Sequence, residues 1–189
     1  MKSLSKEQAK EWCEERGIQA NIGSGLVSLR YEASGSPCFQ ASLALEPPRL
    51  IALAHGLLLH DLPDPDPQDF AGALVWFREW DIWNEASERF GARMLELVRR
   101  SLAGGDLPPL HEAPAHLFSP QEFVDAHVLL TIPAMFQWDA YVVPGSARCL
   151  ALLSHDEYVR ITARSTVILS RIVGRFKLGN WNPEECPPE

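Results

Sequence analysis

The chain has 189 residues, of which 46% are hydrophobic and 22% are charged, and its 17 Lys and Arg against 25 Asp and Glu give a formal charge of −8. This composition is that of an ordinary globular domain and excludes a disordered, a collagen-like or a disulfide-scaffold chain. Nonspecific nucleic-acid binding depends on Lys and Arg that neutralise phosphates, so the negative charge predicts no nucleic-acid partner. We expect a single domain over 1–181 and a frayed acidic tail over 182–189.

The sequence also bears on compartment and redox state. Its N-terminal residues lack the apolar stretch of a signal peptide, and its longest apolar run, 50–59, is too short for a bilayer span. The cysteines are far apart and form no C-x-x-C pair typical of zinc or redox sites. They are Cys13, Cys38, Cys149 and Cys186. We therefore predict a cytoplasmic protein with free thiols and no membrane partner.

Taken in order, the first part of the chain predicts two helices and two strands. A capping-box sequence begins a helix over 6–16. Apolar alternation predicts strands over 26–31 and 38–43, and the Gly-Ser-Pro sequence at 35–37 indicates a hairpin turn between them. The next helix covers 46–60 and is apolar almost all round, which predicts that it is buried.

The middle of the chain predicts a central strand and a long helix. After a proline-rich loop over 61–69, the segment 72–80 has the strongest strand pattern of the sequence. Its apolar first half predicts burial on both faces, as at the centre of a sheet. Asn84 fits the N-cap of a helix over 85–102, and the segment 107–118, rich in Pro and His, is expected to be a loop.

The last third begins with a second capping box at Ser119, and Pro133 ends or kinks the helix behind it. The remaining elements are three strands and a last helix, over 140–143, 148–153, 157–162 and 165–178. A type II turn is expected at Pro144-Gly145, and Cys149 is expected to be a buried, inert thiol. The fold class is α+β, with helices packed on a central mixed or antiparallel sheet of about five to six strands. An antiparallel meander and a C-terminal helix end the fold.

An acidic loop and an aromatic segment point to a protein partner. No Lys or Arg occurs from 50 through 77 or from 101 through 147. The candidate partner-binding aspartates in the loop are Asp61, Asp64, Asp66 and Asp69. Such a surface can steer a basic partner, whereas the alternative is a solvated acidic face that only keeps the protein soluble.

Three of the six tryptophans fall within 76–83. Tryptophan is enriched at binding hot spots, so Trp80 and Trp83 are candidate anchors for the partner. The alternative is that Trp76 and Trp80 pack in the core while Trp83 covers the start of the next helix.

Histidines and a carboxylate supply a second hypothesis, a pocket for a small ligand or a hydrolase-like reaction. Its candidate residues are His60, His111, His116, His155 and Asp156. The spacing of His111 and His116 is one residue too long for the metal-binding motif H-E-x-x-H, and Pro114 interrupts a helix there. A His–carboxylate pair can act as a general base, but adjacent His and Asp are more typical of turns. His127 is expected to be a core histidine.

The sequence holds no phosphate-binding loop, no dinucleotide fingerprint, no nucleophile elbow and no calcium loop. We therefore predict no catalytic residue, no cofactor and no metal. In size, acidity and lack of a motif the chain is similar to bacterial immunity-type inhibitors, small proteins that neutralise a cognate toxin. This similarity of class implies a binder of a basic protein, and the alternatives are the histidine pocket and a scaffold that forms oligomers.

Overall fold

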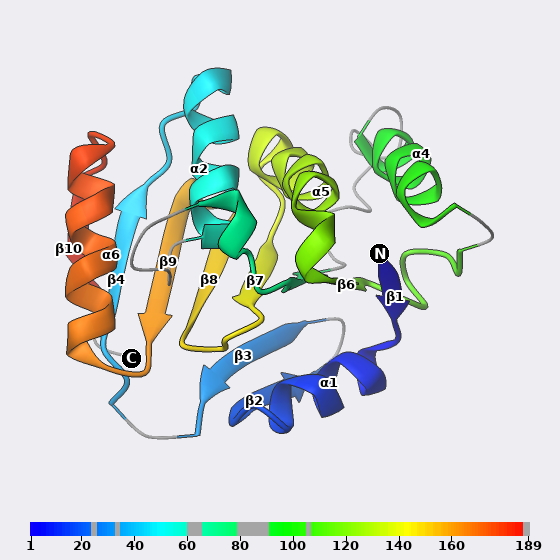
Figure 1. Ribbon diagram of the computed structural model, residues 1–189, viewed down its shortest axis with the longest axis horizontal. Coiled ribbons are helices and arrows are strands. Elements are labelled where there is room, and N and C mark those ends of the chain that lie inside the picture. Colours follow the sequence, from blue (N-terminus) through cyan, green and yellow to red (C-terminus); the bar gives the residue numbers. More distant parts are fainter. Residues whose placement is uncertain (24–25, 33–34, 60–65, 79–90, 105–106, 187–189) are drawn as a thin grey trace.

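The computed structural model describes residues 1–23, 26–32, 35–59, 66–78, 91–104 and 107–186 (Figure 1). The strands are β1 (Lys2–Leu4), β2 (Ile18–Ile22), β3 (Val27–Tyr31), β4 (Cys38–Ser42), β5 (Ala73–Phe77), β6 (Ala115–Phe118), β7 (Ala140–Pro144), β8 (Cys149–Ser154), β9 (Tyr158–Ala163) and β10 (Pro183–Glu185). The helices are α1 (Lys6–Glu14), α2 (Pro47–Leu59), α4 (Gly91–Ala103), α5 (Phe123–Phe136) and α6 (Thr166–Leu178), with short 3-10 turns η1 (Pro67–Asp69) and η3 (Pro120–Glu122).

One sheet of eight strands organises the molecule. Its order is β1-β6-β5-β7-β8-β9-β4-β10, and every neighbouring pair is antiparallel. The strands β2 and β3 form a separate antiparallel hairpin. The α+β class, the meander of β7, β8 and β9, and the helix that follows it are confirmed, and the sheet is larger than expected.

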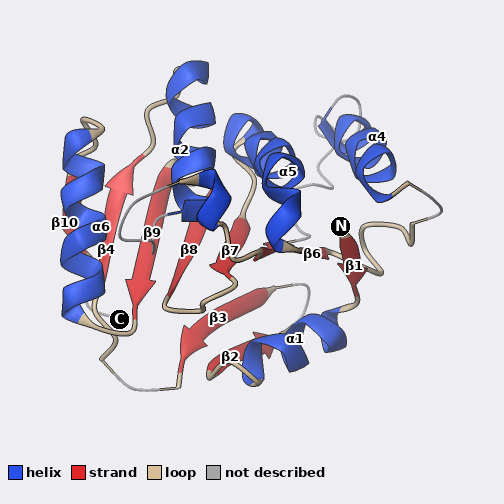
Figure 2. Cartoon of the chain, in the orientation of Figure 1, coloured by secondary structure: helices blue, strands red, loops and turns tan. Residues whose placement is uncertain are grey.

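The sheet separates two apolar layers, because successive side chains of a strand point to opposite faces. In β5, Ala73, Val75 and Phe77 face the layer of α2, α4, α5 and α6. Leu74 and Trp76 face α1 and the β2–β3 hairpin. Figure 2 shows the four helices on one side of the sheet and the hairpin with α1 on the other. All five residues of β5 are buried, which confirms the predicted central strand.

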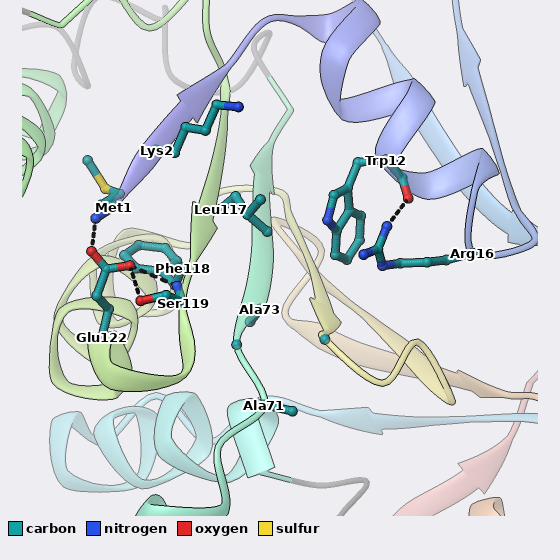
Figure 3. A pocket seen from close by; sticks show the side chains of 12 residues that line it. Met1, Lys2, Trp12, Arg16, Ala71, Ala73, Leu117, Phe118, Ser119 and Glu122 are labelled. Atoms are coloured by element: carbon teal, nitrogen blue, oxygen red, sulfur yellow. Dashed lines mark hydrogen bonds and ion pairs between the residues drawn. The ribbon is translucent and has the colours of Figure 1, made fainter.

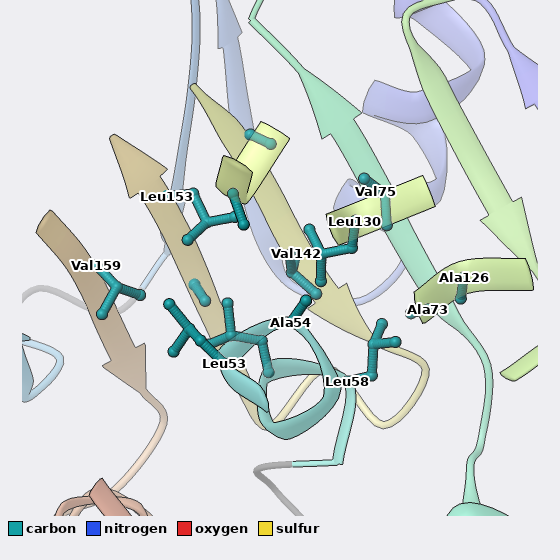
Figure 4. Packing of buried hydrophobic residues seen from close by; sticks show 14 of the residues in the cluster. Leu53, Ala54, Leu58, Ala73, Val75, Ala126, Leu130, Val142, Leu153 and Val159 are labelled. Atoms are coloured by element: carbon teal, nitrogen blue, oxygen red, sulfur yellow. The ribbon is translucent and has the colours of Figure 1, made fainter. Parts of the chain in front are cut away.

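The larger core lies under the helices. Figure 4 shows Leu53 and Leu58 of α2 and Leu130 of α5 beside Val75 and Val142 of the sheet. Each of these side chains is at most 4% exposed. Helices α2 and α5 are therefore rigidly held on their inner faces, and whatever they present outward has a fixed position.

The hairpin predicted between 26–31 and 38–43 is wrong. β3 pairs with β2, whereas β4 pairs with β9 and β10 in the main sheet. The missed strand β2 places Ile18 and Ala20 in the core and turns its polar residues outward. A five-residue alternation with only two large apolar side chains is a weak signal, so β3 was matched to the wrong neighbour.

The C-terminal tail is also more ordered than expected. Residues 183–185 form β10 on β4, although we predicted a frayed tail from 182. Cys38 and Cys186 form a disulfide, so the prediction of four free thiols is wrong for this pair. Cys13 and Cys149 are buried and take no part in this disulfide, as expected for Cys149. Both errors arise because the partners come from opposite ends of the chain, the two cysteines being 148 residues apart, and no local pattern joins them.

Other differences are local. Residues 115–118, expected to be loop, form β6, and α5 continues through Pro133 to Phe136. The expected type II turn at Pro144-Gly145 is absent, because the positive φ, 50°, falls at Ala147 rather than at Gly145. Glycine is required there for another reason, since a Cβ would collide with the carbonyl oxygen of Ala71.

Candidate functional site

The buried carboxylate Asp139 organises a polar cluster where β5, β7 and β8 approach one another. It accepts hydrogen bonds from Nη1 of Arg78 at 2.6 Å, and from the backbone N–H and Nδ1 of His155 at 2.8 and 3.0 Å. Nδ1 donates to the carboxylate of Asp139, so the second ring nitrogen of His155 is Nε2. That nitrogen lies 3.4 Å from the carboxylate of Asp156. The arrangement orients one half-exposed imidazole, as a general base requires.

A second polar cluster is sealed. Arg99 is fully buried and donates to Nε2 of His116 at 2.7 Å and to Glu96 at 2.8 Å. It also donates to the carbonyl oxygens of Pro108 and Ala113. Burial, reinforced by the charge of Arg99, lowers the pKa of His116 to about 3, so this imidazole is a neutral acceptor. The cluster fastens α4 to the segment before β6.

The histidines of the predicted pocket lie apart. His111 is exposed beside Glu112. His116 is on β6, three strand spacings of about 4.8 Å from β8, which His155 follows. Among the described candidates the structure brings together only His155 and Asp156, and His60 lies outside the described residues.

The described residues also leave a cavity of about 510 Å³ between α1, β1, β6 and the start of β5 (Figure 3). On one wall, the guanidinium of Arg16 lies 4.0 Å over the ring of Trp12 and donates to its carbonyl oxygen. On the other wall, Glu122 accepts from the N-terminal amine and from Ser119. Although burial acts to raise it, these hydrogen bonds lower the pKa of Glu122 below its usual value. The side chains of Arg16, Ser119 and Glu122 therefore have partners within the protein.

The outer surface of the helix layer has a different character. In α5, Val124 is 68% exposed and Val128 is 43% exposed, one turn apart, and on the neighbouring helix α2 Ile51 is 42% exposed. The two helices meet at a seam where Nε2 of His127 lies 3.0 Å from the carbonyl oxygen of Ile51. Three apolar side chains are thus presented to solvent on a rigid support.

Carboxylates occur in the first turn of α5 and in the segment that contacts the start of this helix. Phe70, which directly follows η1, contacts Phe123 at the start of α5, with ring centroids 5.3 Å apart. The exposed Asp66, which caps η1, and Asp69, its last residue, precede this contact by one to four residues, and the half-buried Asp125 lies within the first turn of α5. We call this set of residues the acidic–apolar surface. It comprises Ile51, Asp66, Asp69, Val124, Asp125 and Val128.

The seam below this surface holds two imidazoles. The ring centroids of His55 and His127 are 5.4 Å apart, and His55 also contacts Phe123 at 5.1 Å. Burial, with a smaller contribution from His127, lowers the pKa of His55. The predicted core histidine His127 is in fact half-buried, and it joins α5 to α2.

The predicted partner-binding residues are only partly described. Asp66 accepts a hydrogen bond from the backbone N–H of Gln68 at 2.8 Å and so begins η1, while its side chain stays exposed. Asp69 is exposed as well, and the remaining four residues of this set lie outside the described residues, namely Asp61, Asp64, Trp80 and Trp83. Trp76 is buried in the layer under the hairpin.

Sequence reasoning missed Arg78, Asp139, Arg99 and the apolar side chains of α5. A signal was present for the last of these, because the 14 residues of α5 contain one charged side chain, Asp125. A surface helix usually carries polar residues on its outer face, so an apolar helix that still faces solvent is unusual.

Comparison with protein-family models, with curated proteins and with solved structures finds no match for this chain. Within the described residues, no helix is long and apolar enough to cross a membrane. The same residues contain no group of three histidines, cysteines or carboxylates arranged to hold a metal ion.

Proposed function

We propose that this protein is an acidic interaction protein that binds a basic protein partner through the acidic–apolar surface. The observation that carries the proposal is the outward exposure of Val124, Val128 and Ile51 on helices whose inner faces are fixed in the core. Exposed apolar side chains grouped on rigid elements, and rimmed by charge, are typical of protein interfaces.

The charge of the surrounding segments favours a basic partner. Segment 50–77 contains most of α2, all of η1 and β5, and no Lys or Arg. Segment 101–147, which contains β6 and all of α5, also has no Lys or Arg. Because no cation from these segments screens Asp66, Asp69 and Asp125, a basic surface would be attracted over a long range and oriented before contact.

An immunity-type inhibitor fits this description. Such a protein would cover the basic surface of a toxin, with the carboxylates directing the encounter and the apolar side chains closing the contact. The same proposal places the protein in the cytoplasm, where a toxin would have to be neutralised before it acts.

The test is a pull-down with two pairs of variants. The tagged chain is incubated with cytoplasmic extract, washed at low and at high salt, and the retained proteins are identified by mass spectrometry. We expect a basic partner that is retained by the wild type and lost with V124S/V128S. Val167 on α6 is 70% exposed, so V167S is a matched control that should retain the partner.

The contribution of charge is tested with a second pair of variants, by measuring how fast the retained partner associates at low and at high salt. D66N/D69N should slow association at low salt and make it less sensitive to salt, while E184Q/E185Q, on the exposed strand β10, should not. Equal binding by V124S/V128S and V167S, or loss with both, would overturn the proposed surface.

An enzyme or small-ligand function remains the second candidate, and one observation favours it. Asp139 holds Nδ1 of His155 and so orients a half-exposed ring. A compound collection that raises the melting temperature of the wild type, but not of H155A, would support this reading. A set of compounds that stabilises both equally would count against it.

A further inference from the structure

We propose that Cys38 and Cys186 are a reversible thiol–disulfide site, and that reducing their bond releases the C-terminal strand β10 from β4. Cys38 is the first residue of β4, and Cys186 directly follows β10. Their Cα atoms are 5.8 Å apart, and the bond joins residues separated by 148 positions. A cross-link that closes so long a loop strongly restricts the chain it fastens.

The four cysteines fall into two classes that differ in access. Cys13 and Cys149 are fully buried, and burial raises the pKa of the Cys13 thiol to about 12. Cys38 and Cys186 are half-buried at the edge of the main sheet, where β10 is the last strand. Thiol exchange requires an accessible sulfur, so only the second pair can react in the folded protein.

Without the disulfide, β10 is held weakly. It has three residues, and Pro183 has no N–H to donate to the sheet. Its side chains at Glu184 and Glu185 are exposed and add no apolar contact. A strand this short has little stability of its own, so the covalent bond at its end is the main restraint on it.

The residues just before β10 are fastened independently. The guanidinium of Arg49 lies 4.7 Å from the ring centroid of Trp181 and donates to the carbonyl oxygen of Asn180 at 2.9 Å. The Trp181 ring also packs against Phe176 of α6. Release therefore begins after Trp181, and it leaves β4 as an edge strand with unpaired backbone groups.

The chemistry requires a dithiol as reductant. One of its thiolates attacks a sulfur of the Cys38–Cys186 bond and forms a mixed disulfide, and its second thiol displaces the remaining cysteine. The products are two cysteine thiols and the cyclic disulfide of the reagent. Two electrons and two protons pass from the dithiol to the protein, and an oxidised dithiol reverses the step. In the cytoplasm proposed above, the reduced form is the resting form.

The experiment uses the full chain, purified in air and then treated with dithiothreitol under native conditions. Free thiols are alkylated and located by mass spectrometry, and hydrogen exchange is followed in parallel. Before reduction we expect no alkylation, and afterwards alkylation at Cys38 and Cys186 alone. Exchange at 38–42 and at 184–185 should rise by about tenfold or more, because an unfastened edge opens locally, while β7 and β8 stay unchanged.

The double variant C38S/C186S provides the control. It should exchange like the reduced wild type, and dithiothreitol should not change it further, which separates release of β10 from other effects of the reagent. Alkylation of Cys38 and Cys186 in the air-oxidised wild type would overturn the disulfide. Unchanged exchange at 38–42 after complete reduction would overturn the release.

Discussion

Two clusters of this protein each surround one arginine with polar partners, but they differ in how far solvent reaches them. Arg99 is sealed from solvent, and its partners are a carboxylate, two carbonyl oxygens and a neutral imidazole. Arg78 is 19% exposed and is paired with the fully buried Asp139, which also holds the half-exposed His155. The sealed cluster can contribute only to the stability of the folded protein. The open cluster can exchange its bonds with water or a ligand, so the two should respond differently to mutation and to pH.

The largest effect is expected from R99M. This variant keeps the unbranched stem of the side chain but leaves the fully buried His116 without its donor, and it leaves Glu96 with the backbone N–H of Leu110 alone. Removing one partner of a buried ionic group costs about 3–5 kcal/mol of the free energy of unfolding. Chemical denaturation measures the loss. R93M, at an exposed position on the same helix, is the control and should change stability by less than about 0.5 kcal/mol.

D139A should cost less, about 2–3 kcal/mol, although it also removes a buried charge. The reason is that Arg78 and His155 are both partly exposed, so water replaces some of the lost hydrogen bonds. The measurement is the same, with D69A, at an exposed position outside this cluster, as the control. If D139A destabilised the protein more than R99M, exposure would not be what distinguishes the clusters.

The third prediction concerns pH and the sealed cluster. Burial and then the charge of Arg99 lower the pKa of His116 from 6.5 to about 3. Between these values the unfolded chain binds a proton that the folded protein does not bind. Stability therefore falls as the pH drops from about 6.5 towards 3, by up to about 1.4 kcal/mol for each pH unit.

The variant H116Q isolates this contribution, because glutamine offers an oxygen acceptor to Arg99 but does not titrate. Denaturant midpoints of the wild type and H116Q, measured between about pH 7 and pH 4, should diverge in slope. Parallel slopes would show that His116 is protonated in the folded state. Carboxylates contribute to both proteins alike, so the difference between the two curves reports on the histidine.

How much the sequence predicts depends on how local the cause is. The buried strand β5 and the Ser5 capping box are encoded by a few neighbouring residues, and both were predicted. The pairing of β4 with β10 joins segments from the two ends of the chain, and no local pattern specifies it. The functional residues follow the same rule. Asp139 and His155 are 16 residues apart and meet only because β7 and β8 pair.

The acidic–apolar surface is a second feature that the sequence pattern does not predict. Helical periodicity separates buried from exposed residues only where polar and apolar side chains alternate at helical spacing, and α5 is apolar almost all round. It does not say that Val124 and Val128 stay exposed, because an apolar residue on the outer face looks the same in sequence as one in the core. Only the packing of α2 beside α5 decides which apolar side chains remain uncovered.

The smallest effect is expected from H155A, and it completes the comparison. Asp139 would keep the ion pair with Arg78 and the backbone N–H of residue 155, and losing the hydrogen bond from the imidazole costs about 1 kcal/mol. H111A, at an exposed site, is the control and should be neutral in the same denaturation assay. A loss for H155A as large as that for D139A would mean that the imidazole, rather than Arg78, holds the buried carboxylate. The open cluster would then serve only to stabilise the fold, as the sealed one does. The hypothesis of a reactive His155 would be wrong.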